Sequence, residues 1–365
     1  MKISINAKLL KEALENNSTT TSKNNQNQIL KGILFQTEGE SLCLRSTNIS
    51  TGYEKVLNCK VIEEGSFVIS SETINRIFSS ININEDSKAE IEFKENVCSI
   101  KVDNHSVEAK TLSFESFPAL PDVVGENFKI DAQSLIYGLK QVVFSVAKTE
   151  IKPEISGVHV YSDVEQLVFV GTDSYRLSEK KIETKQTLPS LAFIIPEKNV
   201  KDIIKIFNEN KNELEITVSK NSLSIKTPEE YFVTRLIEGN FPNYKQIIPQ
   251  NPESVSVFLK EDISRSLKIV SFFSDKTEQI TLECKETDIN IFAQNFEIGS
   301  ATENINADTK GENFTVKINS RYFEEFLSQT RDASVIVKFT SQNKPIIFQG
   351  IQDNNFLYLI MPSYR

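Results

Sequence analysis

The sequence predicts an α+β fold of three similar domains, each with two helices packed on antiparallel sheets. Three observations support this prediction: a pattern that recurs three times, two amphipathic helical stretches in every repeat, and alternating strands between them. The chain has 365 residues, which is long enough for two or three domains. Its content of 39% hydrophobic and 25% charged residues is typical of a globular protein.

The repeat is visible in short segments. STNISTGYEK at residues 46–55 resembles GTDSYRLSEK at 171–180, and AQNFEIGSATE at 293–303 occupies the corresponding place a third time. Pro118, Pro242 and Pro362 follow apolar residues near the ends of the repeats, at a similar spacing. We therefore expect three domains, at residues 1–124, 125–250 and 251–365.

Each repeat carries two stretches in which apolar residues recur at helical spacing. These residues are Leu10, Ala13 and Leu14, then Ile74, Ile77, Phe78 and Ile81; Leu135, Leu139, Val142, Val143 and Val146, then Val200, Ile203, Ile204 and Phe207; and Ile263, Leu267 and Val270, then Phe323, Phe326 and Leu327. Between them, runs such as SLCLRS, CSIKVD and VSVFLK alternate between polar and apolar residues. This alternation predicts antiparallel strands with one solvated face.

Composition argues against most enzyme classes. The sequence has no glycine-rich phosphate loop, and His105 and His159 are its only histidines, too few for most metal or histidine-based chemistry. The four cysteines show no metal-binding spacing and indicate a reducing compartment; they are Cys43, Cys59, Cys98 and Cys284. We expect no cofactor and no metal. No apolar run is long enough to span a bilayer, so we expect no membrane partner.

Basic residues decorate the polar faces of all six predicted helices. They are Lys8 and Lys11, Arg76, Lys140, Lys198, Lys201 and Lys205, Arg265 and Lys268, and Arg321. The net charge of −9 argues against a protein that coats nucleic acid, unless the charge is unevenly distributed. These cations are therefore either solvated surface or one inner surface of an assembly that brings all the helices together.

The segment GTDSYRLSEK permits more than one interpretation. Asp173 and Arg176 are close enough in sequence to pair, and Ser174 lies between them, which could indicate a catalytic centre. The same residues could instead form a polar turn.

Together, the three repeats, TDSYRL, the GNFPNYKQIIP that closes the second repeat, and the C-terminal YLIMPSYR resemble the bacterial DNA polymerase III beta subunit family, the DNA sliding clamps. The resemblance covers the whole chain. It implies a head-to-tail homodimer closed into a ring that encircles double-stranded DNA without sequence preference. It also implies a cytoplasmic, nucleoid-associated processivity factor without catalytic activity. Its partners would be the DNA polymerase III alpha subunit, the clamp loader and repair proteins, bound through short linear motifs.

The resemblance also implies roles for particular residues. A pocket for partner peptides would be formed by Ile155, Thr172, Tyr175, Arg176, Leu177, Pro242, Ile247, Ile346, Ile360, Met361 and Pro362. The DNA-facing residues would be the ten helix cations listed above together with Lys23 and Lys148. Val107 and Ala109 would face Phe272 and Phe273 across the dimer interface. Asp173 and Ser174 would then belong to a turn.

Some residues depart from the usual pattern of that family. Ser174 and Tyr175 replace a Gly-His pair, Gln246 stands where an arginine is common, and Tyr364-Arg365 replaces an Arg-Leu ending. Two other functions stay open: a repeat scaffold that binds protein partners without encircling DNA, and an enzyme with an Asp173/Arg176 centre.

Overall fold

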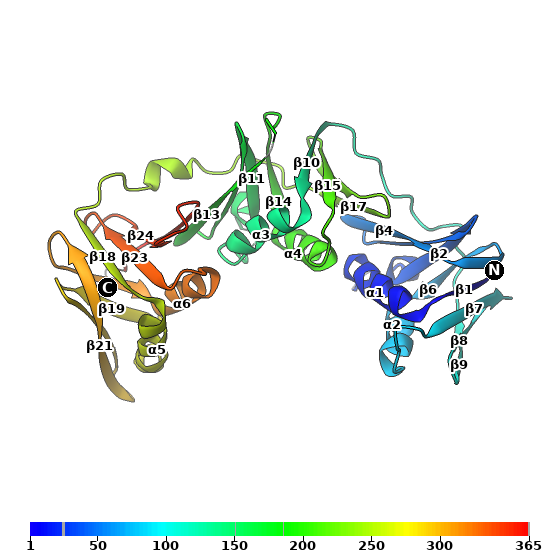
Figure 1. The fold of residues 1–365 in the computed structure, drawn as a ribbon, viewed down its shortest axis with the longest axis horizontal. Coiled ribbons are helices and arrows are strands. Elements are labelled where there is room, and N and C mark those ends of the chain that lie inside the picture. Colours follow the sequence, from blue (N-terminus) through cyan, green and yellow to red (C-terminus); the bar gives the residue numbers. More distant parts are fainter. Residues whose placement is uncertain (24–25, 150, 185, 364–365) are drawn as a thin grey trace. The chain divides into compact units, whose positions relative to one another are not determined.

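The computed structural model describes residues 1–23, 26–149, 151–184 and 186–363 (Figure 1). Within these residues the chain forms six α-helices: α1 (Ala7–Asn17), α2 (Ser71–Ser80), α3 (Ala132–Val143), α4 (Glu197–Phe207), α5 (Lys260–Val270) and α6 (Ser320–Gln329). Two helices fall in each of the three repeats, as the periodicity of the sequence predicts.

The predicted apolar faces of these helices are their buried faces. Leu10 and Leu14 of α1 are fully buried, and so are Phe323 and Phe326 of α6. Ile204 of α4 lies at the margin of its buried face and is only partly covered. In the described ranges, no helix combines the length and the apolar character needed to cross a bilayer.

All six described helices begin directly at the end of a strand, and in four of them the side chain of the last strand residue caps the helix. The side chains of Asn6, Ser70, Asp131 and Asn319 each accept a hydrogen bond from the backbone N–H group three residues later. Such a cap satisfies one of the N–H groups that the first helical turn leaves without a partner. One polar residue thus stabilises the start of the helix at each of these four junctions, whereas Leu259 before α5 makes no such bond.

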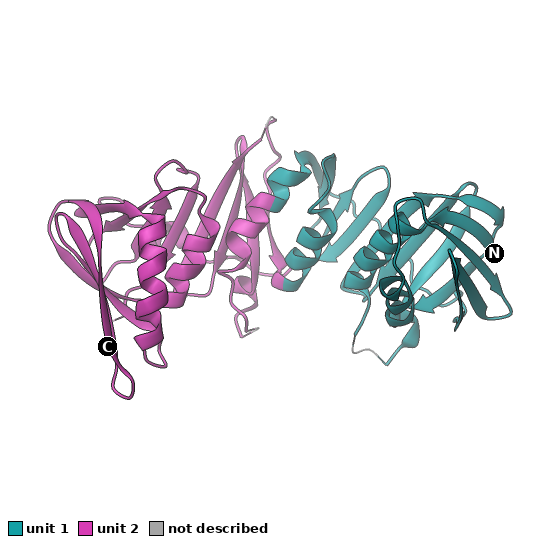
Figure 2. Ribbon diagram, turned by 60° about the horizontal axis from the view of Figure 1, so that its bottom comes forward, with its two compact units in different colours: residues 1–136, 198–236 teal, residues 137–197, 237–365 magenta. Residues whose placement is uncertain are grey.

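The contacts of the chain divide it into two compact units (Figure 2). Unit 1 contains residues 1–136 and 198–236, and unit 2 contains residues 137–197 and 237–365. All the strand pairs in both units are antiparallel, as the alternating pattern predicts.

Unit 1 contains a sheet of five and a sheet of eight strands among the described residues. The first has the order β5 (Lys60–Glu63), β1 (Lys2–Asn6), β7 (Lys88–Lys94), β8 (Val97–Val102) and β9 (His105–Lys110). The second has the order β10 (Glu126–Asp131), β15 (Glu213–Val218), β16 (Ser222–Lys226), β17 (Glu230–Arg235), β4 (Thr51–Asn58), β3 (Ser41–Thr47), β2 (Gly32–Glu38) and β6 (Ser66–Ser70).

Unit 2 contains a sheet of twelve strands among its described residues. Its order is β14 (Ala192–Pro196), β11 (Gly157–Asp163), β12 (Gln166–Thr172), β13 (Arg176–Glu183), β25 (Phe356–Ile360), β24 (Ile346–Gly350), β23 (Ser334–Phe339), β18 (Ser254–Leu259), β21 (Gly299–Lys310), β20 (Asp288–Asn295), β19 (Gln279–Cys284) and β22 (Phe314–Asn319). Strand β21 belongs to two parts of this sheet: residues 299–306 pair with β20, and residues 307–310 pair with β18.

The two units do not follow the three repeats because strands pair across the predicted domain boundaries. Strand β17 of the second repeat pairs with β4 of the first, with Phe232 opposite Tyr53. Strand β13 of the second repeat pairs with β25 of the third, with Leu177 opposite Leu359. Each half of the second repeat thus shares a sheet with a different neighbour. The boundaries 1–124, 125–250 and 251–365 stay a prediction.

Candidate functional site

The turn between β12 and β13 is fixed by its own side chains. Thr172 Oγ1 donates to the carbonyl of Arg176 (2.7 Å) and accepts from the N–H of Ser174 (3.2 Å). Asp173 Oδ1 accepts from the N–H groups of Tyr175 (2.9 Å) and Arg176 (3.0 Å). Ser174 has a φ of 78°, in the left-handed region that few residue types other than glycine adopt readily. The Asp173 side chain therefore acts as the anchor of a turn.

The first repeat builds the same turn from other residues. Thr47 Oγ1 donates to the carbonyl of Thr51 (2.8 Å) and accepts from the N–H of Ile49 (3.0 Å). Asn48 Oδ1 accepts from the N–H groups of Ser50 (3.0 Å) and Thr51 (2.9 Å). Ile49 has a φ of 78°, the same value as the middle residue of the second turn. The likeness of the two sequence segments thus reflects one hydrogen-bonding scheme used twice.

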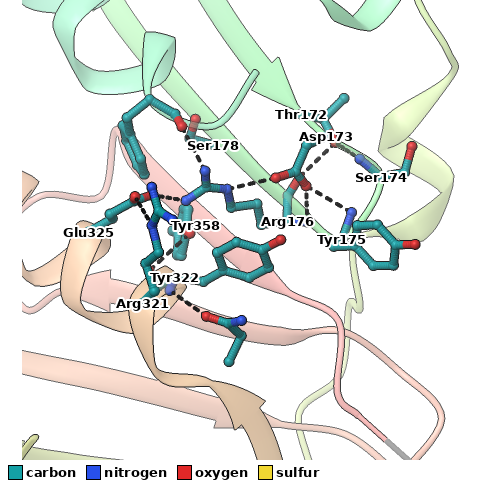
Figure 3. A network of polar contacts seen from close by, with 12 residues as sticks. Thr172, Asp173, Ser174, Tyr175, Arg176, Ser178, Arg321, Tyr322, Glu325 and Tyr358 are labelled. Atoms are coloured by element: carbon teal, nitrogen blue, oxygen red, sulfur yellow. Dashed lines mark hydrogen bonds and ion pairs between the residues drawn. The ribbon is translucent and has the colours of Figure 1, made fainter. Parts of the chain in front are cut away.

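The Arg176 side chain is buried beside this turn (Figure 3). Its Nε donates to Asp173 Oδ2 (3.0 Å), one terminal nitrogen donates to the carbonyl of Phe144 (2.8 Å), and the other donates to Glu325 Oε2. The guanidinium carbon lies 4.3 Å from the centre of the Tyr322 ring. Because the side chain is only 5% exposed, this charge needs such partners to be tolerated. The Asp173–Arg176 pair is thus part of the packing between β13, α3 and α6.

A small cavity opens beside the turn. It has a volume of about 50 Å³ and is lined by Thr172, Ser174, Tyr175, Arg176, Leu177, Ile247, Pro345, Leu359 and Met361. Six of these nine residues belong to the peptide pocket predicted from the sequence. At the mouth, Tyr175 is 66% exposed, Ile247 is 47% exposed and Met361 is 37% exposed. Exposed apolar side chains around an apolar floor are typical of a docking surface for another protein.

The wall that contains Ile247 is held by a tyrosine three residues earlier. Tyr244 begins the short 3₁₀ helix η4 (Tyr244–Ile247) and is buried against Val168 and Leu177. Its hydroxyl is hydrogen-bonded to Glu179 and Tyr161. Burial, together with these bonds, raises the pKa of the Tyr244 phenol, so the group stays a neutral donor. The segment that connects the second and third repeats is thereby anchored on the sheet.

Other residues of the predicted pocket lie elsewhere. Ile346 and Ile360 are fully buried in the hydrophobic core of the third repeat and lie outside the lining of this cavity, so their place in a peptide pocket stays a prediction. Ile360 lies outside the lining because side chains alternate along a strand: in β25, Leu359 faces the cavity and Ile360 faces the core.

The remaining predicted pocket residues, Ile155, Pro242 and Pro362, are also outside the lining of the cavity. Ile155 and Pro362 are buried and Pro242 is exposed. The predicted set leaves out three lining residues, Ser174, Pro345 and Leu359, of which only Leu359 on β25 could have been indicated by alternation along a strand. The ending Tyr364-Arg365 lies outside the described residues.

The basic residues predicted to face DNA are exposed in the structure, apart from Lys11, which is half-buried. Several form ion pairs with nearby acids: Lys8 with Glu85 (3.1 Å), Arg76 with Glu72 (2.8 Å), Arg265 with Glu261 (3.3 Å) and Arg321 with Glu325 (3.1 Å). Ion pairs at the surface contribute little to stability, so an incoming phosphate can replace the acid at low cost.

Helix α4 carries an acid among its three lysines. Asp202 lies between Lys201 and Ile203 and is half-buried, and its Oδ2 has no hydrogen-bond partner among the described residues. Burial raises the pKa of Asp202 to about 6, although the charges of Lys198 and Lys205 oppose this shift. The helix therefore becomes more positive in mildly acidic solution.

The residues predicted to form a dimer interface differ in their exposure. Phe272 is 71% exposed, whereas Phe273 is partly buried against the core of the third repeat. Both belong to the 3₁₀ helix η5 (Ser271–Phe273). On β9, Ala109 is buried in the core of the first repeat and Val107 is half-buried. Phe272 is thus the residue of this set that is most available to a partner.

Three family models match the chain: DNA polymerase III beta subunit, N-terminal domain, at residues 1–121; central domain, at 129–243; and C-terminal domain, at 245–364.

Relatives and solved structures agree with these models. The chain is 24% identical to the beta sliding clamp of Rickettsia bellii over 99% of both chains, and 24% identical to that of Streptococcus pneumoniae over 98% of both. The fold resembles the DNA polymerase III beta subunit of Thermotoga maritima (TM-score 0.94, 21% identity, 100% of this chain and 99% of the other). It also resembles the sliding clamp of Pseudomonas aeruginosa bound to griselimycin (TM-score 0.95, 20% identity, 100% of both chains).

Replacing Asp202 by Asn is expected to raise the free energy of unfolding by about 1 kcal/mol near neutral pH, because a half-buried carboxylate without a partner is removed. The folded protein binds the Asp202 proton more tightly than the unfolded chain does. This acid therefore makes stability fall as the pH rises from about 4 to about 6. Urea unfolding at several pH values measures both effects.

The exposed Asp86 provides a control for that measurement. Asp86→Asn removes the same charge from the same unit and should leave the pH profile of the parent unchanged. If the free energy of unfolding of Asp202→Asn varied with pH as the parent's does, Asp202 would be well solvated in the folded protein.

Proposed function

The chain belongs to the DNA polymerase III beta subunit family, and on this premise we propose that it is a ring-shaped DNA sliding clamp. Two copies would close head to tail around duplex DNA. The ring would tether the replicative polymerase and other DNA-processing proteins in the cytoplasm and so confer processivity. It would do this without catalytic activity of its own.

The observation that carries this proposal is the distribution of charge. The chain has a net charge of −9, yet each of the six described helices presents at least one of the predicted basic residues. A ring that brings these helices to its inner surface concentrates positive charge along the path of the duplex. Lysine and arginine attract phosphates without reading bases, so such a ring can slide.

Free strand edges support closure by a second copy. Strand β9 ends the five-stranded sheet of unit 1. In unit 2, residues 299–306 of β21 pair with β20 on one side, and the pairing with β18 on the other side begins only at Ala307. Unpaired edges readily accept a strand of another chain. Phe273 lies beside this free half of β21, because a Cβ atom on Gly299 would be 3.6 Å from the Phe273 ring.

The cavity beside Thr172–Arg176 supports the docking of partner peptides. An aliphatic floor with Met361 at its mouth suits a Leu or Phe anchor, because the flexible thioether side chain adapts to different shapes. The Asp173–Arg176 pair lends no support to an enzyme, since both side chains are engaged in packing contacts.

Retention on DNA tests the proposed function. We expect the protein, loaded onto a nicked circular plasmid, to stay bound and to be lost when the plasmid is cut once, because a ring leaves only over a free end. Replacing Lys198, Lys201 and Lys205 by Glu should reduce retention on any sequence, and the parent's retention should weaken as salt rises. Gel filtration of the loaded plasmid measures both effects.

Equal retention on circular and linear DNA would contradict encirclement. Absence of DNA binding by a protein that still binds peptide would favour the alternative, a scaffold for protein partners. If the triple variant is retained like the parent over a range of salt, these lysines are solvated surface.

Phe272→Asp is expected to weaken the dimer at least tenfold, because burying an unpaired charge at an interface costs several kcal/mol. Analytical sedimentation over micromolar concentrations measures the effect. Ile62→Asp is a matched control: Ile62 is 58% exposed on β5, at the opposite edge of the sheet that ends in β9. A parent protein that sediments as a monomer throughout, or a Phe272→Asp dimer as strong as the parent's, would contradict this interface.

Ile247→Ala combined with Met361→Ala is expected to weaken the binding of a peptide that carries a glutamine and ends in Leu-Phe by well over tenfold, since central anchor contacts contribute about 2 kcal/mol or more each. Calorimetric titration measures the affinity. Both residues are partly exposed at the mouth of the cavity, so their truncation should leave the core intact. Leu177 is left unchanged because it is buried in the core beneath.

Ile351→Ala is the control for the peptide titration, because Ile351 is a similarly exposed aliphatic residue of unit 2 that does not line the cavity. It should bind the peptide like the parent. If the Ile247/Met361 variant did so too, the peptide would dock elsewhere.

A further inference from the structure

One carboxylate in unit 2 is shared by two arginines. Glu325 Oε1 accepts from Arg321 Nε at 3.1 Å, and Glu325 Oε2 accepts from Arg176 (Figure 3). Arg321 and Glu325 lie one turn apart on α6, whereas Arg176 begins β13. The side chain of Arg321 is 52% exposed and that of Arg176 is 5% exposed. Glu325 therefore joins a surface cation to a buried one.

The two ion pairs differ in how easily they break. The Arg321–Glu325 pair is at the surface, where water and phosphate compete well with a carboxylate. The Arg176–Glu325 pair lies at a buried guanidinium whose other partners are Asp173 and the carbonyl of Phe144. Removing one acid from a buried cation leaves charge without compensation, which is costly. A ligand that pairs with Arg321 therefore breaks the Arg321–Glu325 ion pair and leaves the Glu325 carboxylate paired with Arg176 alone.

The loss of the Arg321–Glu325 ion pair reaches the cavity through Arg176 and the turn Thr172–Arg176. The backbone carbonyl of Arg176 accepts from Thr172, and its N–H donates to Asp173. The carbonyl of Tyr175, within the same turn, accepts from the N–H of Met361 at 2.8 Å. Thr172, Tyr175 and Met361 all line the cavity. The Arg176 side chain is itself tied to this turn by its Nε–Asp173 bond, and the turn is tied to Met361 on the other side of the cavity.

We propose that Glu325 is a positioning residue that couples the DNA-facing surface to the peptide pocket. A phosphate that pairs with Arg321 releases Oε1 of Glu325, and the whole carboxylate then holds Arg176 and the turn Thr172–Arg176. DNA thereby favours the arrangement of the pocket that binds peptide. Because coupling free energies are reciprocal, a docked peptide strengthens the hold on DNA by the same factor. This inference rests on the proposed function.

The test measures peptide affinity with and without DNA. A fluorescein-labelled peptide with a glutamine and a Leu-Phe end is titrated with the full-length protein at constant low salt, alone and with a saturating short duplex. For the parent we expect the duplex to strengthen peptide binding about fivefold, the low end of typical couplings. Arg321→Gln should bind the peptide at least as well as the parent without DNA, and the duplex should add nothing.

Two carboxylate variants separate coupling from general effects. Glu325→Gln should weaken peptide binding about tenfold and abolish the effect of the duplex, because Arg176 loses a partner. Glu324→Gln removes the same charge from the neighbouring position of α6, where the side chain accepts from Ser271 at 2.8 Å, and should keep the fivefold effect. Arg321→Gln changes only an exposed side chain, so its result does not depend on whether Glu325→Gln folds.

The outcomes are distinguishable. If the parent binds both ligands but the duplex leaves peptide affinity unchanged, the coupling is wrong and the proposed function stands. If Arg321→Gln responds to the duplex as the parent does, the coupling does not pass through Glu325. If the parent neither binds the peptide nor stays on the nicked circular plasmid, the proposed function itself fails.

Discussion

Backbone hydrogen bonding at strand edges is the constraint on which this architecture depends. A strand that ends a sheet exposes N–H and C=O groups that need partners, and a strand of a neighbouring repeat provides them. The pairs β4–β17 and β13–β25 satisfy two such edges within the chain. The second of these pairs also places the C-terminal strand beside the turn Thr172–Arg176, so the cavity beside this turn results from joining two repeats. The edges that remain at β9 and in β21 are where we propose that a second copy binds.

Much of the fold could be predicted from local patterns. The apolar residues of all six helices were identified because a periodicity of 3.6 is set by the helix itself and needs no knowledge of the partner. The repeated Thr-Asn and Thr-Asp segments were recognised as equivalent, and the structure shows why: the side chains of Thr47 and Thr172 make the same pair of hydrogen bonds. Such bonds join residues at most four apart, so the sequence carries their signal.

The parts that escaped prediction depend on contacts between distant residues. Arg176 lines the cavity, but its guanidinium is bound to Glu325, 149 positions later. Nothing in the local sequence indicates that partner. Ile360 was placed in the pocket wall, but the neighbouring Leu359 lines the cavity, because a shift of one position along a strand reverses the direction of every side chain. The residues that face the cavity are decided by the pairing of β25 with β13, which no local pattern indicates.

The turn that occurs in the first and second repeats also governs how these segments can diverge by mutation. The side chains of Thr172 and Asp173 each make two hydrogen bonds to the backbone of the turn. A substitution at either position breaks both bonds, so we expect selection to keep these two residues. Within the described residues, the side chain of Ser174 makes no such hydrogen bond. Its φ of 78° is also adopted by Gly, Asn or Asp with little strain. Variation should therefore collect at the middle of the turn. The third repeat has only part of this hydrogen-bonding scheme: Asn295 accepts from the N–H of Glu297, but Gln294 stands where the other two turns have threonine.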